Sequence, residues 1–147
     1  MQAFFNNIVE LFEAICRSTG MQYSELNILV YCLLLPAFWC ALVWIRSRKL
    51  GWLLLLLLGL TAIYLVEKQH LLPFSLHFYR QNILALERLG ASTGLGYVGI
   101  SLVMGVGIPL LFSLALLFLQ KKLLPACYLC YLAINLGYYC RVFALAI

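Results

Sequence analysis

The residues best suited to covalent chemistry are two cysteines, Cys127 and Cys130, near the start of the last apolar stretch of this 147-residue chain. A Cys-x-x-Cys pair on a helix can act as a redox dithiol when the local environment lowers the pKa of one thiol. The same residues can equally be packing side chains, because free cysteine behaves as a small apolar residue. The spacing therefore leaves a redox dithiol and a packing pair both open.

Within a small helical membrane protein, this cysteine pair resembles that of the DsbB and vitamin-K-epoxide-reductase families. The resemblance implies a quinone-linked thiol oxidoreductase that depends on Cys127 and Cys130. The sequence departs from that pattern at two places: the pair follows Lys121 and Lys122, which favour the inner side of a membrane, and segment 67–94, the expected outer loop, contains no cysteine. Both departures favour the packing interpretation.

Other catalytic and metal-binding patterns are missing from the sequence. The two histidines, His70 and His77, lie seven residues apart with Glu67 nearby, and two ligands do not make a zinc site without a third. The chain has no aspartate, which excludes a Ser-His-Asp triad in its usual form, and neither a P-loop nor a dinucleotide fingerprint is present. We therefore predict no catalytic residue, no metal site and no cofactor.

A stripe of polar side chains runs along the last apolar stretch. On a helical wheel its members fall within one arc, with the arginine at the edge: Tyr128, Tyr131, Asn135, Tyr138 and Arg141. Polar groups inside a bilayer are costly, so they face a bundle interior or a water-filled path. The stripe therefore predicts either hydrogen bonds between helices or the lining of a pore.

The preceding apolar stretch is rich in small residues, which predicts close helix packing or a hinge. The residues concerned are Gly96, Gly99, Ser101, Gly105, Gly107 and Pro109. The segment from Thr93 to Gly99 is similar to the TVGYG filter of potassium channels in composition, but the order and spacing of its residues differ. We favour packing or a hinge for these glycines.

The amino-acid composition indicates that this chain folds in a lipid bilayer and not in water. Hydrophobic residues make up 65% of the sequence and charged residues 10%, and the mean hydropathy is +1.01, which is unlike a water-soluble globular domain. The formal net charge of +5 is scattered through short connectors, so the sequence offers no nucleic-acid groove. These features predict an all-α integral membrane protein with the lipid bilayer as its main partner.

Hydropathy divides the chain, residues 1–147, into the elements of one membrane domain. An amphipathic helix is predicted over 3–17, followed by transmembrane helices over about 26–45, 50–66, 95–119 and 124–145. Ser24 stands where a helix N-cap is expected, with Asn27 three residues later. A further amphipathic helix over about 73–89 is predicted to be interfacial or re-entrant, with Pro73 in its first turn.

Basic residues predict the orientation. Two dense basic connectors, 46–49 and 121–122, follow the first and third predicted spans, and such connectors face the cytoplasm. An even number of spans then places both termini on the outer side of the membrane.

The stretch from Tyr23 through Glu25 and Asn27 to Tyr31, followed by Leu35-Pro36 and Trp39, resembles a pattern in small multi-span membrane effectors of bacterial anti-phage operons, such as the membrane component of Hailong-type systems. The resemblance covers the first third of the chain. It implies an inner-membrane effector that oligomerises and permeabilises the membrane on a nucleotide-derived signal, or with a signalling-enzyme partner.

A monomer with four helices is too small to enclose a wide aqueous path, so a pore needs several copies. We therefore expect a homo-oligomeric ion channel or pore-forming effector in the bacterial inner membrane. A thiol oxidoreductase of the DsbB type and a non-catalytic scaffold or transporter subunit are the alternatives.

Overall fold

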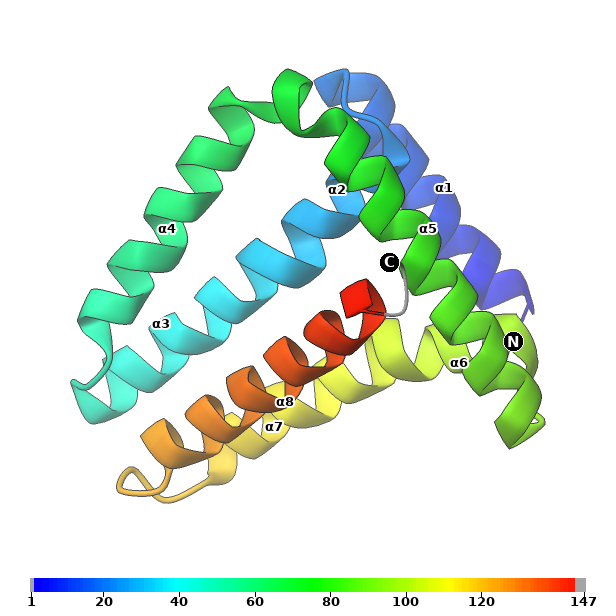
Figure 1. Ribbon diagram of the computed structural model, residues 1–147. Coiled ribbons are helices and arrows are strands. Elements are labelled where there is room, and N and C mark those ends of the chain that lie inside the picture. Colours follow the sequence, from blue (N-terminus) through cyan, green and yellow to red (C-terminus); the bar gives the residue numbers. More distant parts are fainter. Residues whose placement is uncertain (1, 145–147) are drawn as a thin grey trace.

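The computed structural model describes residues 2–144, and the side chains of residues 2–141. Every regular element in that range is a helix, and Figure 1 shows their arrangement, which confirms the all-α prediction. The elements are α1 (Gln2–Thr19), α2 (Tyr23–Ile28), the π-helical η1 (Leu29–Leu34), α3 (Leu35–Ser47), α4 (Gly51–Val66), α5 (Lys68–Thr93), α6 (Gly96–Leu102), the π-helical η2 (Val103–Gly107), α7 (Ile108–Phe118) and α8 (Leu124–Ala144).

Two turns lie at one end of the molecule, at the lower left of Figure 1. The first joins α3 to α4 through Arg48 and Leu50, which adopt positive φ angles of 57° and 65°. The second joins α7 to α8. The guanidinium of Arg46 donates hydrogen bonds to the backbone carbonyls of Leu116 and Leu119, the second at 3.1 Å. Because terminal carbonyls of a helix have no partner within it, Arg46 both satisfies the end of α7 and ties it to α3.

The main core lies next to these turns, where α3 packs against α4, α7 and α8. Trp39 is at its centre and is fully buried; its indole N–H donates to the Ser113 hydroxyl at 2.8 Å. The hydroxyl of Tyr128, also fully buried, donates to the Pro36 carbonyl at 2.8 Å. The buried members of this core are Ala37, Trp39, Cys40, Val43, Leu53, Leu57, Leu116, Leu124 and Tyr128.

Near the start of the chain, the N-terminus of α2 differs from the sequence prediction. The N-cap is Gln22, not Ser24, and the Gln22 N–H donates to the Glu25 carboxylate at 2.7 Å. The carboxylate of a Glu at the third helical position satisfies a free N–H in this way. The Ser24 hydroxyl is instead buried and has no hydrogen-bond partner within the described residues.

The chain bends by 103° between α4 and α5. The prediction that Pro73 lies in the first turn of a helix is wrong, because α5 begins at Lys68 and Pro73 lies inside it. The Glu67 carbonyl accepts the Leu71 N–H at 3.0 Å, so α5 starts directly after α4. The missing proline N–H leaves only the carbonyl of Gln69 without its helical donor, and Gln69 is exposed.

Both long apolar helices contain a π-helical turn just before a proline. In the first, the Leu35 N–H bonds to the carbonyl of Val30, five residues back, ahead of Pro36. In the second, the Ile108 N–H bonds to the carbonyl of Val103, again five residues back, ahead of Pro109. A proline ring clashes with the carbonyl four residues earlier in an α-helix, and the wider turn relieves that crowding. At each proline, a π-helical turn therefore takes the place of a regular α-helical turn.

Two continuous helical stretches in residues 2–144 are long and apolar enough to cross a membrane: Tyr23–Ser47 and Gly96–Phe118, both with a mean hydropathy of 2.4. The bent pair α4 and α5 makes a third if it is counted as one broken span. By itself α4 has 16 residues, which corresponds to about 24 Å of helix, less than a hydrocarbon core of about 30 Å. Helix α8, with Asn135 and several tyrosines, is not among the candidates.

Candidate ligand-binding cavity

A cavity of about 510 Å³ lies between the helices, in the half of the molecule away from the two turns. Its walls come from α1, from α2 with η1, from α5, from α6 with η2, and from α8. In Figure 1, α5 crosses the far ends of the long helices, and it packs against α2, α6 and α8. The lining residues fall within three separate stretches of the chain, 5–35, 78–109 and 131–139, which together surround one partly open space.

Helix α1 covers one side of this cavity. Its lining residues, Phe5, Ile8, Val9 and Phe12, recur at the three- and four-residue spacing of a single helix face. The Phe12 ring lies 5.9 Å from that of Tyr23 and 6.3 Å from that of Tyr31, and no residue of α1 is fully buried. A few aromatic contacts thus hold α1 over the cavity.

The lining is rich in aromatic rings and carries no charge. Among the described residues that line it are seven tyrosines and three phenylalanines, and none of them is Asp, Glu, Lys, Arg or His. Burial is the largest cause that raises the pKa of Tyr79, on α5, to about 12, so this phenol stays neutral at physiological pH. An ionic ligand would lose its hydration here without meeting an opposite charge.

Three asparagines face the cavity, and each has the same internal hydrogen bond. The side-chain amides of Asn27, Asn82 and Asn135 donate to the carbonyl four residues earlier, at 2.8, 2.9 and 2.9 Å. This bond orients each carboxamide and uses its N–H side. Because an amide oxygen only accepts, the groups left for another molecule include three oriented acceptors.

Ser101 contributes a hydroxyl of a different kind. Ser113 and Thr61 donate to the carbonyl four residues earlier in their helices. The enclosed Ser101 oxygen, however, has no hydrogen-bond partner within the described residues. Ser101 lines the cavity. A buried hydroxyl without a partner destabilises the fold by about 1–3 kcal/mol, and a ligand would relieve that loss by bonding to the oxygen after the side chain turns toward the cavity.

A glycine beside Ser101 makes room for a tyrosine side chain. A Cβ atom added at Gly105 would lie 3.1 Å from the Tyr31 hydroxyl oxygen, which is tighter than an ordinary contact. Both residues line the cavity. Gly105 therefore leaves room for the Tyr31 hydroxyl at the cavity wall.

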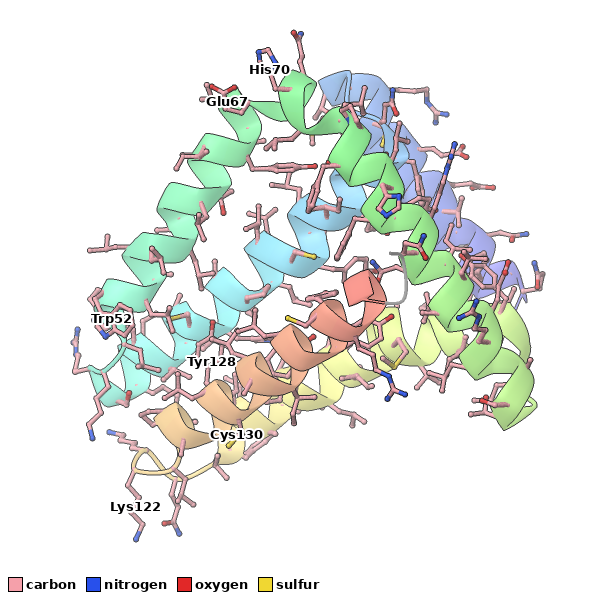
Figure 2. All side chains as sticks on the ribbon, viewed as in Figure 1. Trp52, Glu67, His70, Lys122, Tyr128 and Cys130 are labelled. Atoms are coloured by element: carbon pink, nitrogen blue, oxygen red, sulfur yellow. The ribbon has the colours of Figure 1, made fainter. Side chains whose placement is uncertain are left out.

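The residues of the predicted polar stripe of α8 lie in three different environments in the structure. Tyr131, Asn135 and Tyr138 line the cavity, Tyr128 lies in the core against α3, and Arg141 is exposed. Figure 2 labels Tyr128 on the side of α8 that faces α3. The stripe thus serves both packing and the cavity.

The predicted small residues are divided in the same way. Ser101, Gly105 and Pro109 line the cavity, together with stripe residues from α8. Gly96, Gly99 and Gly107 do not line it; Gly96 has a positive φ of 67° and starts α6.

The residues considered for redox or metal chemistry lie away from the cavity. Cys127 is half-buried and Cys130 exposed, and both are free thiols outside the cavity lining. His70 and His77 are exposed, and Figure 2 shows His70 beside Glu67 at the α4–α5 bend, far from Lys122. No group of three His, Cys, Asp or Glu side chains in the part of the chain described could hold a metal ion.

Sequence reasoning missed the asparagines of α2 and α5 as members of a site. Each follows an aromatic residue by four positions: Tyr23 and Asn27, Phe78 and Asn82, and Tyr131 and Asn135. This aromatic-x-x-x-Asn spacing on three helices was the available signal, because it puts ring and amide on one helix face.

Comparison with known proteins adds no relative from which a function could be transferred. No protein-family model matches this chain, and neither a curated protein nor a solved structure matches it.

Proposed function

We propose that this chain is a membrane-embedded binding protein that holds a bilayer-soluble, uncharged molecule in the cavity between its helices. The observation that carries the proposal is the partly open space of about 510 Å³ whose described lining residues include no charged side chain. Ligand sites have volumes of about 300–1,000 Å³ and are mostly apolar with a few placed polar groups. The oriented asparagines and the unpartnered Ser101 hydroxyl are such polar groups.

In the proposed topology four helical segments cross the bilayer: Tyr23–Ser47, α4, α6 through α7, and α8, with the bilayer locally thinned around the short α4. Two of these are supported by length and hydropathy. Exposed apolar side chains along α4 and α7, such as Leu55, Val66, Leu111 and Phe118, fit a lipid environment. α5 follows α4 at 103°, so it lies close to the membrane plane and α1 covers the cavity beside it.

The proposed orientation follows from the two turns. Both basic connectors lie at the end where Arg46 ties α3 to α7. Since connectors rich in Lys and Arg face the cytoplasm, the cavity belongs to the outer half of the bilayer and both termini to the outer side, in a bacterial inner membrane.

The binding function is tested with two tryptophan substitutions in the same π-helical turn. Val106 lines the cavity, whereas Val103 is exposed and does not. We expect organic extraction and mass spectrometry of the purified wild-type protein to recover a small molecule at about one copy per chain. Val106→Trp, which fills the cavity, should lose this molecule, and Val103→Trp should keep it. The same extract from all three proteins would contradict the proposal.

A second candidate function is a homo-oligomeric ion channel or pore-forming effector. One observation favours it: Tyr131, Asn135 and Tyr138 line a space between the helices, and none of them is fully buried. The resemblance to Hailong-type membrane components implies that a nucleotide-derived signal, or a signalling-enzyme partner, would open such a channel by binding outside the uncharged cavity.

Flux through proteoliposomes tests the channel directly. We expect the channel function to give ion flux that Asn135→Leu reduces at least tenfold, because the substitution removes an oriented polar group from the path. Cys130→Ser, at an exposed position outside the cavity, is the control and should conduct like the wild type. A stable oligomer that carries no current, with and without candidate nucleotides, excludes this function.

A further inference from the structure

We infer that the molecule held in the cavity is an uncharged aromatic alcohol of the phenol or naphthol class, a flat ring system with a hydroxyl group. This inference rests on the proposed binding function and specifies its ligand. It follows from three features of the lining: the arrangement of the rings, the absence of charge, and the mixture of hydrogen-bonding groups.

The rings offer a flat ligand both faces and edges. Around the cavity, Tyr23 meets Tyr79 at 6.0 Å and an interplanar angle of 70°, whereas Phe12 meets Tyr31 at 6.3 Å and 18°. Tyr138 meets Tyr139 at 5.4 Å and 63°. Aromatic groups pair in stacked and edge-to-face geometries at such distances. An aromatic ligand can therefore extend the existing contacts, while a saturated chain would gain only apolar burial.

The neutral lining selects against ionic ligands. A carboxylate or phosphate would find no cation among the lining residues. Aromatic faces attract cations such as a quaternary ammonium ion, but no carboxylate among the described lining residues balances such a charge. An uncharged ligand is thus the best match.

The polar groups call for a ligand oxygen that both donates and accepts. The amide oxygens of Asn27, Asn82 and Asn135 are acceptors held in place by their internal bonds. The Ser101 hydroxyl has no partner within the described residues, and it can donate or accept once its side chain turns the oxygen toward the cavity. A ligand hydroxyl can donate to an amide oxygen and accept from Ser101 at the same time, whereas a ligand carbonyl could only accept.

Four probes with the same ring and different substituents test the inference: naphthalene, 1-naphthol, 1-naphthoate and trimethyl-1-naphthylammonium. Binding is measured by calorimetry on the full chain in lipid nanodiscs at pH 7. Val106→Trp in identical nanodiscs serves as the blank for partition into lipid. We expect 1-naphthol to bind about tenfold more tightly than naphthalene, the ratio that its two neutral hydrogen bonds to the lining give together, and the two ions to bind at the blank level.

Ser101→Ala removes the unpartnered hydroxyl without adding volume. It should bring the affinity for 1-naphthol to within about threefold of that for naphthalene, because the donor has been lost. Ser92→Ala, the same substitution at an exposed position of α5 outside the cavity, should leave both affinities unchanged.

The possible results separate the ligand class from the binding function. Equal binding of naphthalene and 1-naphthol above the blank would overturn the role of the hydroxyl but support the cavity as a binding site. Tightest binding of the ammonium probe would overturn the class in favour of quaternary ammonium ligands. If no probe exceeds the blank while extraction still recovers a molecule lost in Val106→Trp, the aromatic class is wrong and the binding function stands.

Discussion

Replacing Trp39 with alanine should lower the free energy of unfolding by about 3–5 kcal/mol, the range found when large aromatic residues are removed from cores. Trp39 is fully buried, and its ring lies 4.8 Å from that of Phe112 and 4.7 Å from that of Tyr131. Denaturant titration of the purified protein in detergent measures the change. Because Tyr131 also lines the cavity, the variant should bind ligand more weakly as well.

Trp52→Ala is the matched control for this prediction, since Trp52 is 69% exposed. A surface substitution changes stability by no more than about 0.5 kcal/mol in most cases. Equal losses for the Trp39 and Trp52 variants would show that the core does not depend on Trp39.

Replacing Gly90 with alanine should separate α5 from α6. A Cβ atom added at Gly90 would lie 2.7 Å from both the backbone carbon and the carbonyl oxygen of Gly96, and 3.1 Å from the Tyr97 nitrogen. Backbone atoms cannot rotate away as a side chain can, so the helices must move apart. We expect a loss of about 1–3 kcal/mol, typical of overpacking, measured by the same denaturant titration.

Gly59→Ala provides the opposite expectation at a matched helical position. A Cβ atom added there meets nothing within 4 Å, and alanine stabilises a helix relative to glycine by about 0.5–1 kcal/mol. The Gly90 variant should also weaken ligand binding, because Tyr79 on α5 and Tyr97 on α6 both line the cavity. A stabilised Gly90→Ala protein would contradict the close contact between these helices.

The helices could be predicted well from the sequence because their signals are local. The apolar face of α1 and the leucine run of α4 are visible as periodicity and hydropathy. The start of α5 was not predictable in this way, because Pro73 is a frequent first-turn residue and only the fold shows that the helix continues back to Lys68.

The cavity could be predicted only in part. The stripe of α8 indicated that Tyr131, Asn135 and Tyr138 face inward, but periodicity gives no information on what they face. Asn27 was interpreted as part of a helix-start signal, although its amide lies at the cavity wall. The lining is assembled from segments far apart in the chain, and their contacts are set by tertiary packing that local patterns do not encode.

The π-helical turns ahead of Pro36 and Pro109 have a genetic consequence. Each turn accommodates one residue more than a regular α-helical turn, and one residue corresponds to a rotation of about 100° around the helix axis. Deleting a single codon within Leu29–Leu34 would therefore restore a regular helix and rotate Tyr23 and Asn27 away from the cavity. A homologue could keep every lining residue and still present a different binding surface if it lacked that one position.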